Sequence, residues 1–260
     1  IKKMKIAFIM GGSQGIGLAI STLLIEKGYQ IAVFARNTNK LNEIKGQLGS
    51  NCSVFECDTT NYVPMSATLD LAIQKLGVPD VLINCVGRAK PNYFEKISSD
   101  EFAATLNTNI LGIVHPCQFI FPLMKNRKNG IIINTSSVAG FLGVFGYTDY
   151  AASKFAIIGF SESLRQEGAK HGIDIKVLCP PDTETPGLEA ENKTKPIETK
   201  AISEGGGLLK PEKIAAAVFE SLGTKSFYIL PGFDSKITFW IKRHFPSLID
   251  WMIKRKLKRF

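Results

Sequence analysis

The sequence predicts one α/β domain in which about seven parallel strands form a doubly wound sheet with helices on both faces. Short apolar runs alternate with longer amphipathic stretches, and the runs are apolar at consecutive positions rather than at every second one. Strands that are covered on both faces have this continuous pattern. The length of 260 residues and the 45% hydrophobic content suffice for one sizeable core.

The expected strands are apolar runs at 6–10, 31–35, 53–57, 81–84, 131–135, 175–179 and 228–230. Helical patterns fall near 15–27, 38–48, 61–76, 100–125, 150–171 and 211–223. The stretch 180–207 is polar, ends in three glycines and has neither pattern. We expect it to be an irregular lid over a binding site, the alternative being a plain surface insertion.

One apolar stretch, 102–124, has no formally charged residue and is long enough to cross a bilayer. It contains Asn107, Asn109, His115 and Gln118, which are unfavourable in lipid. We therefore expect a buried helix that another subunit covers in part. A homodimer or a homotetramer is expected.

The net charge of +9 is concentrated at the C-terminus. Residues 235–260 hold eight Lys or Arg residues and one Asp, a net of +7, so residues 1–234 carry only about +2. A nucleic-acid-binding protein would be expected to spread basic residues over a folded face. The distribution argues against a nucleic-acid partner and divides the chain into an α/β domain, 1–234, and a basic amphipathic tail, 235–260.

The cysteine pattern and the start of the chain indicate a cellular compartment. The five cysteines are odd in number and have no CxxC spacing, which argues against a disulfide framework and against a metal site and is typical of a reducing cytosol. The residues up to Lys5 lead directly into the first strand, which leaves no space for a signal peptide in the printed sequence. We expect a cytoplasmic protein with free thiols and no metal.

A glycine-rich segment directly follows the first strand and opens the first helix, within residues 11–17. Glycines at this point let the backbone turn sharply and approach a pyrophosphate, whose charge the helix N-terminus stabilises. The alternative is a tight turn without a ligand. The residues expected to contact a dinucleotide are Gly11, Ser13, Gln14, Gly15, Ile16 and Gly17.

The residues after the next strands indicate which dinucleotide binds. The second strand ends without the carboxylate that would accept from a ribose 2′-hydroxyl, and Arg36 and Lys40 follow it. Two cations at this point favour the 2′-phosphate of NADPH, unless both are solvated surface residues. Asp58 is expected to accept from the adenine amino group, and Asn84 and Gly87 to lie beside the cofactor.

Three further residues have the spacing of a proton-transfer site. Tyr150 and Lys154 are four residues apart, so a helix places them on one face. An ammonium next to a phenol stabilises the phenolate and lowers the pKa of the phenol from about 10 towards neutrality. Ser137 leaves the end of the fifth strand and can donate a hydrogen bond to a carbonyl oxygen that gains negative charge.

These motifs together resemble the short-chain dehydrogenase/reductase family. The resemblance runs from about Lys5 to Leu230 and includes GGSQGIG, NCVG, NTSSVAG, YAASK and the asparagine of NILG. It implies a single Rossmann-type domain. Met10 in place of the usual threonine, and NCVG in place of the commoner NNAG, depart from the family pattern without removing a catalytic group.

The resemblance also implies residue roles. Asn109, Ser137, Tyr150 and Lys154 would form a catalytic tetrad. Tyr150 would donate the proton, Lys154 would bind the nicotinamide ribose, and Asn109 would hold a water in the proton relay. Because Ser137 lies thirteen residues before Tyr150, it is preferred over Ser136 for the carbonyl contact.

A narrower resemblance comes from the segment after the sixth strand, residues 179–187, and from Gly146-Tyr147-Thr148. This pattern, with Pro181 where most of the family has glycine, is similar to 3-ketodihydrosphingosine reductases (3-dehydrosphinganine reductases), although Pro181 on its own can simply stiffen a turn. It implies NADPH-dependent reduction of 3-ketosphinganine to sphinganine. Pro180, Thr183 and Thr185 would then contact NADPH. The alternatives are a reductase of a 3-oxoacyl thioester or of a hydroxysteroid, and a non-catalytic NADPH-binding protein tethered to a membrane.

The tail interleaves its basic residues with apolar ones, including Trp240 and Trp251, the two tryptophans of the chain. Lys242 and Lys254 interrupt the apolar stretches, which are too short to cross a bilayer. Aromatic and aliphatic groups beside lysines are typical of a segment that lies in the interface of an anionic membrane. We expect a peripheral enzyme at the cytoplasmic face of a membrane, the alternative being a tail that packs on the protein or on a partner subunit.

Overall fold

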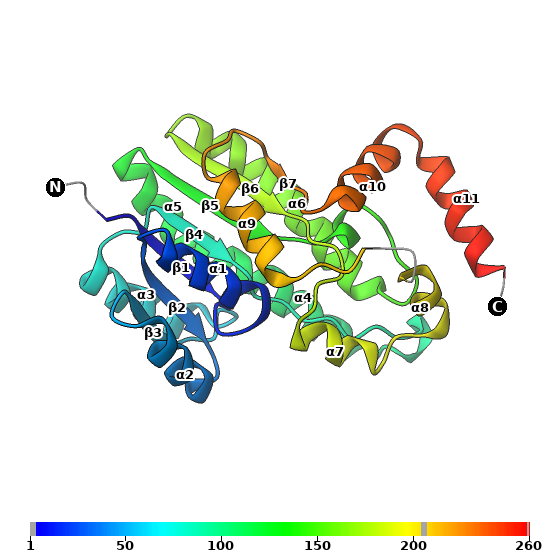
Figure 1. The fold of residues 1–260 in the computed structure, drawn as a ribbon, viewed down its shortest axis with the longest axis horizontal. Coiled ribbons are helices and arrows are strands. Elements are labelled where there is room, and N and C mark those ends of the chain that lie inside the picture. Colours follow the sequence, from blue (N-terminus) through cyan, green and yellow to red (C-terminus); the bar gives the residue numbers. More distant parts are fainter. Residues whose placement is uncertain (1–3, 204–206, 259) are drawn as a thin grey trace.

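Seven parallel strands form one sheet in the computed structural model, which describes residues 4–203, 207–258 and 260 (Figure 1). The strand order is β3-β2-β1-β4-β5-β6-β7. The strands are β1 (Ile6–Met10), β2 (Gln30–Ala35), β3 (Cys52–Glu56), β4 (Val81–Asn84), β5 (Gly130–Thr135), β6 (Ile173–Leu178) and β7 (Tyr228–Ile229). Each predicted strand is present to within two residues at either end, so the predicted fold class is confirmed.

The sheet is buried on both faces because its strands are apolar at consecutive positions. In β1, Phe8 and Met10 belong to one hydrophobic cluster, whereas Ala7 and Ile9 belong to the cluster on the opposite face. All four side chains are fully buried. Successive side chains of a strand point to opposite faces, so a strand between two helical layers has to be apolar throughout.

Two groups of helices supply these layers (Figure 1). The helices α1 (Gly15–Glu26), α2 (Thr38–Leu48) and α9 (Pro211–Ser221) contribute buried residues to the cluster on one face. The cluster on the other face contains residues of α3 (Tyr62–Leu76), α5 (Gly112–Arg127) and α6 (Thr148–Ala169). The five cysteines are free thiols, as the sequence predicts.

The long helix expected at 100–125 is divided into three parts, which corrects the prediction. The α4 helix (Ser99–Leu106) continues through a π-helical segment, Asn107–Leu111, into α5. A π-helical turn holds more residues than an α-helical one and so rotates the side chains that follow. Ile113, Cys117 and Ile120 of α5 are buried in the core, and no described helix is long and apolar enough to cross a membrane.

The expectation of an irregular segment at 180–207 is also wrong. Two short helices, α7 (Pro186–Asn192) and α8 (Ile197–Ser203), lie within it, while Gly205 and Gly206 fall outside the described residues. Pro186 at the first turn of α7 and the side chain of Thr185, which accepts a hydrogen bond from the Leu188 amide, define the start of α7. Helices of seven residues are too short to produce a recognisable helical periodicity in the sequence.

The basic tail forms two helices, α10 (Phe233–His244) and α11 (Pro246–Leu257). The boundary expected at residue 234 therefore falls inside the first turn of α10. Phe239 packs edge-on against Phe141, with 5.1 Å between the ring centres, and Ile249 is buried. Part of the tail thus packs on the α/β domain. Two 3₁₀ turns, η1 (Phe94–Lys96) and η3 (Val138–Gly140), complete the described elements.

Candidate active site

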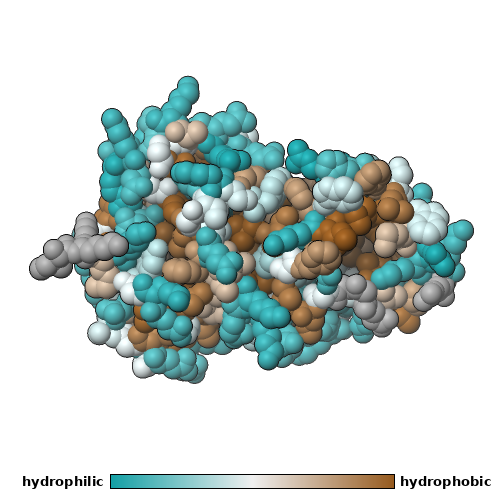
Figure 2. Space-filling view, turned by 45° about the horizontal axis from the view of Figure 1, so that its top comes forward, coloured by the Kyte–Doolittle hydropathy of each residue, from teal (hydrophilic) through white to brown (hydrophobic). Residues whose placement is uncertain are grey.

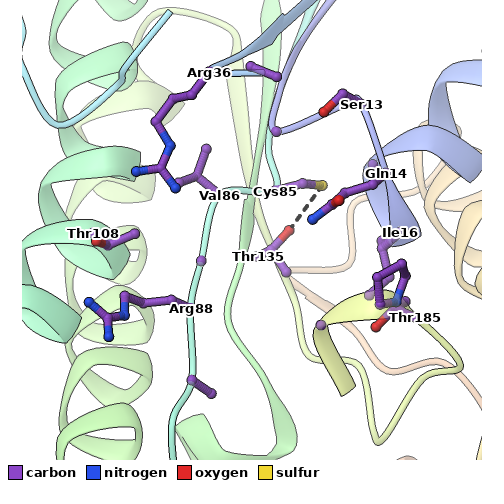
Figure 3. Close-up of a pocket in the computed structure, with 18 of the residues that line it drawn as sticks. Ser13, Gln14, Ile16, Arg36, Cys85, Val86, Arg88, Thr108, Thr135 and Thr185 are labelled. Atoms are coloured by element: carbon purple, nitrogen blue, oxygen red, sulfur yellow. Dashed lines mark hydrogen bonds between the residues drawn. The ribbon is translucent and has the colours of Figure 1, made fainter. Parts of the chain in front are cut away.

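The strand order changes direction between β1 and β4, because β1 pairs with β2 on one side and with β4 on the other. Open parallel sheets bind ligands in the crevice at the carboxyl ends of strands at such a point. A cleft of about 750 Å³ opens there (Figure 3). The predicted cofactor residues that line it are Gly11, Ser13, Gln14, Gly15, Ile16, Gly17, Arg36, Lys40, Asp58, Gly87, Tyr150, Lys154, Pro180 and Thr185.

Two glycines bring bare backbone to one wall of this cleft. Gly11 has a φ of 76°, and its amide donates a 2.8 Å hydrogen bond to the Phe34 carbonyl. A Cβ at Gly17 would lie 2.3 Å from the carbonyl oxygen of Gly11, so no larger residue fits. The turn between β1 and α1 therefore presents main-chain groups at the start of a helix, the arrangement that binds phosphate groups.

Charged groups occupy the end of the cleft beyond β2. The Lys40 ammonium donates a hydrogen bond to Gln14, and Arg36 lies on the side of the cleft that also holds Arg88 and Thr108 (Figure 3). Burial raises the pKa of Asp58, but hydrogen bonds from Thr60 and the positive charge of Arg36 outweigh it and hold that pKa below its usual value. Two cations and one ionised carboxylate thus border this end of the cleft.

Tyr150 and Lys154 lie on one face of α6 in the wall of the same cleft. The Lys154 Nζ is 5.5 Å from the centre of the Tyr150 ring and donates a 3.0 Å hydrogen bond to the Thr135 carbonyl at the end of β5. A Cβ at Gly87 would lie 3.2 Å from the same Nζ. The segment after β4, the end of β5 and α6 therefore meet at this ammonium. Burial lowers the pKa of Lys154 to about 8.

The expected decrease in the pKa of Tyr150 is not found in the structure. Burial raises that pKa above its ordinary value, and the negative charge of Glu191 raises it further, while a hydrogen bond with Ser137 lowers it. Desolvation of the phenolate therefore outweighs the stabilisation by Lys154 that the spacing predicts. As a result, the Tyr150 hydroxyl remains protonated at neutral pH.

The two adjacent serines occupy different places. The Ser136 hydroxyl donates a 2.8 Å hydrogen bond to the carbonyl of Lys154 and is buried. Ser136 also lines the polar cleft, whereas Ser137 lines a second cavity, of about 370 Å³, which Tyr150 borders as well. The assignment of the carbonyl contact to Ser137 stays a prediction.

The second cavity is bounded by apolar side chains from distant parts of the chain. Leu142 and Val144 come from the segment before α6, and Ile241 and Ile253 come from α10 and α11. The cleft and the second cavity share five lining residues, and these are Ile16, Tyr150, Pro180, Thr185 and Glu191. The Tyr150 side chain therefore lies where a polar cleft meets an apolar cavity.

Three predicted site residues lie elsewhere. Asn84 is fully buried in the sheet, where its side-chain amide donates a 2.8 Å hydrogen bond to Asn134, so it does not line the cleft. Thr183 borders the second cavity rather than the cleft. The side chain of Asn109 is also buried: its Oδ1 accepts a 2.8 Å hydrogen bond from the Arg88 amide, and its Nδ2 donates a 3.0 Å bond to the Arg88 carbonyl. Its role in holding a water stays a prediction.

Several residues of the site were not predicted. Thr135 lines the cleft at the end of β5, where its position next to predicted residues was a usable signal (Figure 3). Cys85 and Val86 also line it, and they belong to the segment 84–87 that is expected beside the cofactor. Tyr147 and Glu191 were also missed. They are 44 residues apart, and the Tyr147 hydroxyl donates a 2.8 Å hydrogen bond to the Glu191 carboxylate. No local sequence pattern predicts a contact between residues that are 44 positions apart.

Known proteins are similar to this chain in sequence and in fold. The family model of the short chain dehydrogenases matches residues 5–196. A 3-dehydrosphinganine reductase of Danio rerio is 38% identical over 218 residues, which are 81% of this chain and 66% of that protein. A 3-ketodihydrosphingosine reductase of Mus musculus matches with the same identity and the same shares. The chain thus spans about two thirds of the length of these two relatives.

A solved structure has the same fold. It is a short chain dehydrogenase/reductase from Burkholderia phymatum in complex with NAD, with a TM-score of 0.84, 23% identity and coverage of 95% of each chain. The family model covers most of the sequence, and the motifs that carry the resemblance lie at the strand ends that form the cleft. The protein therefore belongs to the short-chain dehydrogenase family.

Proposed function

We propose that this protein is an NADPH-dependent reductase that converts 3-ketosphinganine to sphinganine. The observation that carries the proposal is the position of Tyr150, which lies with Lys154 in a polar cleft and with Ser137 in an adjoining apolar cavity. A nucleotide and a long-chain ketone would meet at this residue. The names of the two curated relatives support the same substrate.

The cleft fits a nicotinamide dinucleotide phosphate. The bare backbone of Gly11 and Gly17 would hold the pyrophosphate at the start of α1, and Lys154, beside Gly87, would hold the nicotinamide ribose. Arg36 and Lys40 would bind the 2′-phosphate, since neither has an ion-pair partner within 4 Å among the described residues. The preference for NADPH over NADH rests on these two cations.

The reaction needs a hydride, a proton and a site that polarises the carbonyl group. When bound, NADPH would supply the hydride to the carbonyl carbon. The Ser137 hydroxyl would donate a hydrogen bond to the carbonyl oxygen, where negative charge develops. Tyr150, which holds its proton at neutral pH, would deliver it to that oxygen, and the Lys154 ammonium would stabilise the phenolate that remains.

Asn109 would act by positioning rather than by contact with the substrate. Its side chain joins the Arg88 backbone to the Ser153 hydroxyl, which is 2.9 Å away on α6. These bonds hold the loop after β4 against the helix that carries Tyr150 and Lys154. Asn109 would thus keep the two walls of the cleft at a fixed spacing.

The apolar cavity would take the alkyl chain of the ketone. Its walls come in part from the tail helices, so α10 and α11 close one side of it. The segment with α7 and α8 contributes Leu188 and Ile202 to the same cavity, and the Lys256 ammonium of α11 donates a hydrogen bond to the Ile202 carbonyl. We propose that this segment is the substrate lid and that chain length is limited by the tail.

The outer surface of the tail would lie on an anionic membrane at the cytoplasmic face. Figure 2 shows hydrophobic side chains gathered at the end of the molecule that carries α10 and α11. Trp240, Phe245 and Trp251 are each more than half exposed there, and exposed Lys254 and Lys258 lie beside them. Aromatic and basic groups on one amphipathic surface are suited to the membrane interface, where a sphingoid ketone also resides.

A substrate comparison tests the proposed function. Purified protein is incubated with NADPH and, separately, with 3-ketosphinganine, a 3-oxoacyl thioester and a ketosteroid, and the oxidation of NADPH is followed by absorbance. We expect the highest kcat/KM for 3-ketosphinganine. A preference for the thioester or the steroid would assign the protein to another branch of the family. Binding of NADPH without oxidation in the presence of any of the three ketones would indicate a non-catalytic protein.

A further inference from the structure

A carboxylate without a cationic partner lies at the junction of the two cavities. Glu191, near the end of α7, lines both the polar cleft and the apolar cavity, as Tyr150 does. Its Oε2 accepts a 2.8 Å hydrogen bond from the hydroxyl of Tyr147, a residue that is itself buried. The rings of Tyr147 and Tyr150 are 5.5 Å apart, so the carboxylate lies close to the proposed proton donor. The proton transfer described above does not use Glu191.

The charges of Lys195 and Lys154 lower the pKa of this group, but neither lysine forms an ion pair with it. Two other acidic residues line the apolar cavity. Asp182 forms an ion pair of 3.2 Å with Lys195, and Asp234 is exposed to solvent at the start of α10. Among the described residues, no Lys or Arg nitrogen lies within 4 Å of a Glu191 oxygen. Lys256 borders the same cavity from α11, but its ammonium donates to the backbone of α8 at 3.1 Å.

The direct partner of the Glu191 carboxylate is therefore a neutral phenol. A carboxylate removed from water requires a cation or several hydrogen-bond donors to remain ionised. Burial accordingly raises the pKa of Glu191, although the hydrogen bond from Tyr147 and the charge of Lys195 oppose this change. A cationic ligand at this position would restore the missing interaction.

We propose that Glu191 binds the ammonium group of the substrate and selects 2-amino ketones over ketones that lack an amine. The inference rests on the proposed function, because 3-ketosphinganine carries a primary amine on the carbon next to its ketone. With the ketone oxygen between Ser137 and Tyr150, this amine lies one carbon away from the reacting centre. The carboxylate that borders both cavities beside Tyr150 is the acceptor available to it.

Tyr147 would be a positioning residue for this contact. Its hydroxyl holds one carboxylate oxygen of Glu191 and leaves the other for the ligand. Its ring packs against the Tyr150 ring, so the two side chains set the distance between the ammonium site and the proton donor. Neither a 3-oxoacyl thioester nor a ketosteroid has a cation that would make use of this arrangement.

The test compares the cationic ketone with a neutral derivative that is acylated on the same nitrogen. The kcat/KM values for 3-ketosphinganine and for its N-acetyl derivative, which is neutral, are measured for the wild type, for Glu191→Gln and for Glu189→Gln. Glu189 lies on the same helix and is exposed, so its variant is the matched control. For Glu191→Gln we expect kcat/KM to fall roughly 10- to 100-fold with the amine and to stay within about threefold with the amide.

Two further variants separate a binding role from a structural one. Glu191→Asp keeps the charge, and we expect it to retain part of the preference for the amine. Tyr147→Phe removes the hydroxyl that holds the carboxylate, and we expect it to raise KM for the amine with little change in kcat. NADPH binding, followed by fluorescence, is expected to be unchanged in all of these variants.

The outcomes also separate the inference from the proposed function. One outcome is a wild type that reduces 3-ketosphinganine while Glu191→Gln leaves the ratio of the two kcat/KM values unchanged. This result would overturn the role of Glu191 and leave the proposed function standing. A wild-type enzyme that reduces neither ketone would overturn the proposed function itself.

Discussion

The Nζ atom of Lys154 lies 5.5 Å from the centre of the Tyr150 ring and is fixed by a 3.0 Å hydrogen bond to the carbonyl of Thr135. The bond ties α6 to the end of β5, so the sheet itself sets the position of the ammonium relative to the phenol. The polar cleft and the apolar cavity meet at Tyr150, the proposed proton donor. The following predictions test what each group contributes.

Replacement of Tyr150 by Phe is expected to lower kcat about 10³-fold or more, because the ring remains and only the proton donor is lost. NADPH binding, measured by titration of cofactor fluorescence, is expected to change by less than about threefold. Tyr228→Phe is the control, since its hydroxyl bonds Glu162 at the surface. Near-normal ketone reduction by Tyr150→Phe would show that another group supplies the proton.

The pH dependence of reduction is expected to follow Lys154. Burial lowers the pKa of its ammonium to about 8, so the positive charge is present below this pH and is lost as the pH rises through it. The raised pKa of Tyr150 keeps the phenol protonated over the same range. The value of kcat/KM for the ketone should therefore be flat near neutrality and fall above about pH 8. A profile that rises between neutral and alkaline pH would contradict this assignment.

The two serines are expected to respond differently to truncation. Ser137→Ala should lower kcat by about 10²-fold or more, because it removes a donor to the developing oxyanion. Ser136→Ala should instead lower the free energy of unfolding by about 1 kcal/mol, because its hydroxyl bonds the Lys154 carbonyl in the interior. Steady-state kinetics and thermal unfolding of both variants measure these effects. If Ser136→Ala had the larger effect on kcat, the assignment of the carbonyl contact would be reversed.

Arg36 is expected to determine the choice of cofactor. Arg36→Ala should reduce the ratio of kcat/KM for NADPH to that for NADH by about 10- to 100-fold, since it removes one cation from the 2′-phosphate site. Lys45→Ala, an exposed residue of the same region on α2, should leave the ratio unchanged. If the ratio of kcat/KM for NADPH to that for NADH did not change in Arg36→Ala, this arginine would be a solvated surface residue without a role in cofactor choice.

The tail is expected to bind vesicles that contain anionic lipid. Reversal of two exposed charges in Lys254→Glu/Lys258→Glu should weaken partitioning about 30-fold or more, because each basic residue near such a surface contributes roughly 1 kcal/mol. Lys213→Glu/Lys225→Glu changes the net charge equally on the α/β domain and is the control. Equal losses in both double variants, measured by vesicle sedimentation, would indicate a general charge effect instead of a surface formed by the tail.

Much of this site could be predicted because its parts follow strands directly. The glycine turn comes after β1, Arg36 after β2, Asp58 after β3 and Gly87 after β4, and parallel strands bring all their carboxyl ends to one edge. Tyr150 and Lys154 depend only on the helical repeat. Continuous apolar runs were sufficient to identify the strands.

Features that depend on contacts between distant segments could not be predicted. The π-helical turn buries Asn109 against the Arg88 backbone, and no period in the sequence shows it. The hydrogen bond between Tyr147 and Glu191 also joins distant segments, since 44 positions separate the two residues. The same holds for the tail, which lines the apolar cavity together with residues from the α/β domain. The change in the pKa of Tyr150 was predicted with the wrong sign, because burial cannot be estimated from the spacing of two residues.

Transfer of an isotopic label tests the central claim most directly. NADPH that carries deuterium at the reactive position of its nicotinamide is incubated with the protein and 3-ketosphinganine, and the product is examined by mass spectrometry. We expect sphinganine with one deuterium bound to C3 and, in heavy water with unlabelled cofactor, no deuterium on that carbon. Label at C3 that originates from the solvent, or oxidation of the cofactor without labelled sphinganine, would contradict this expectation.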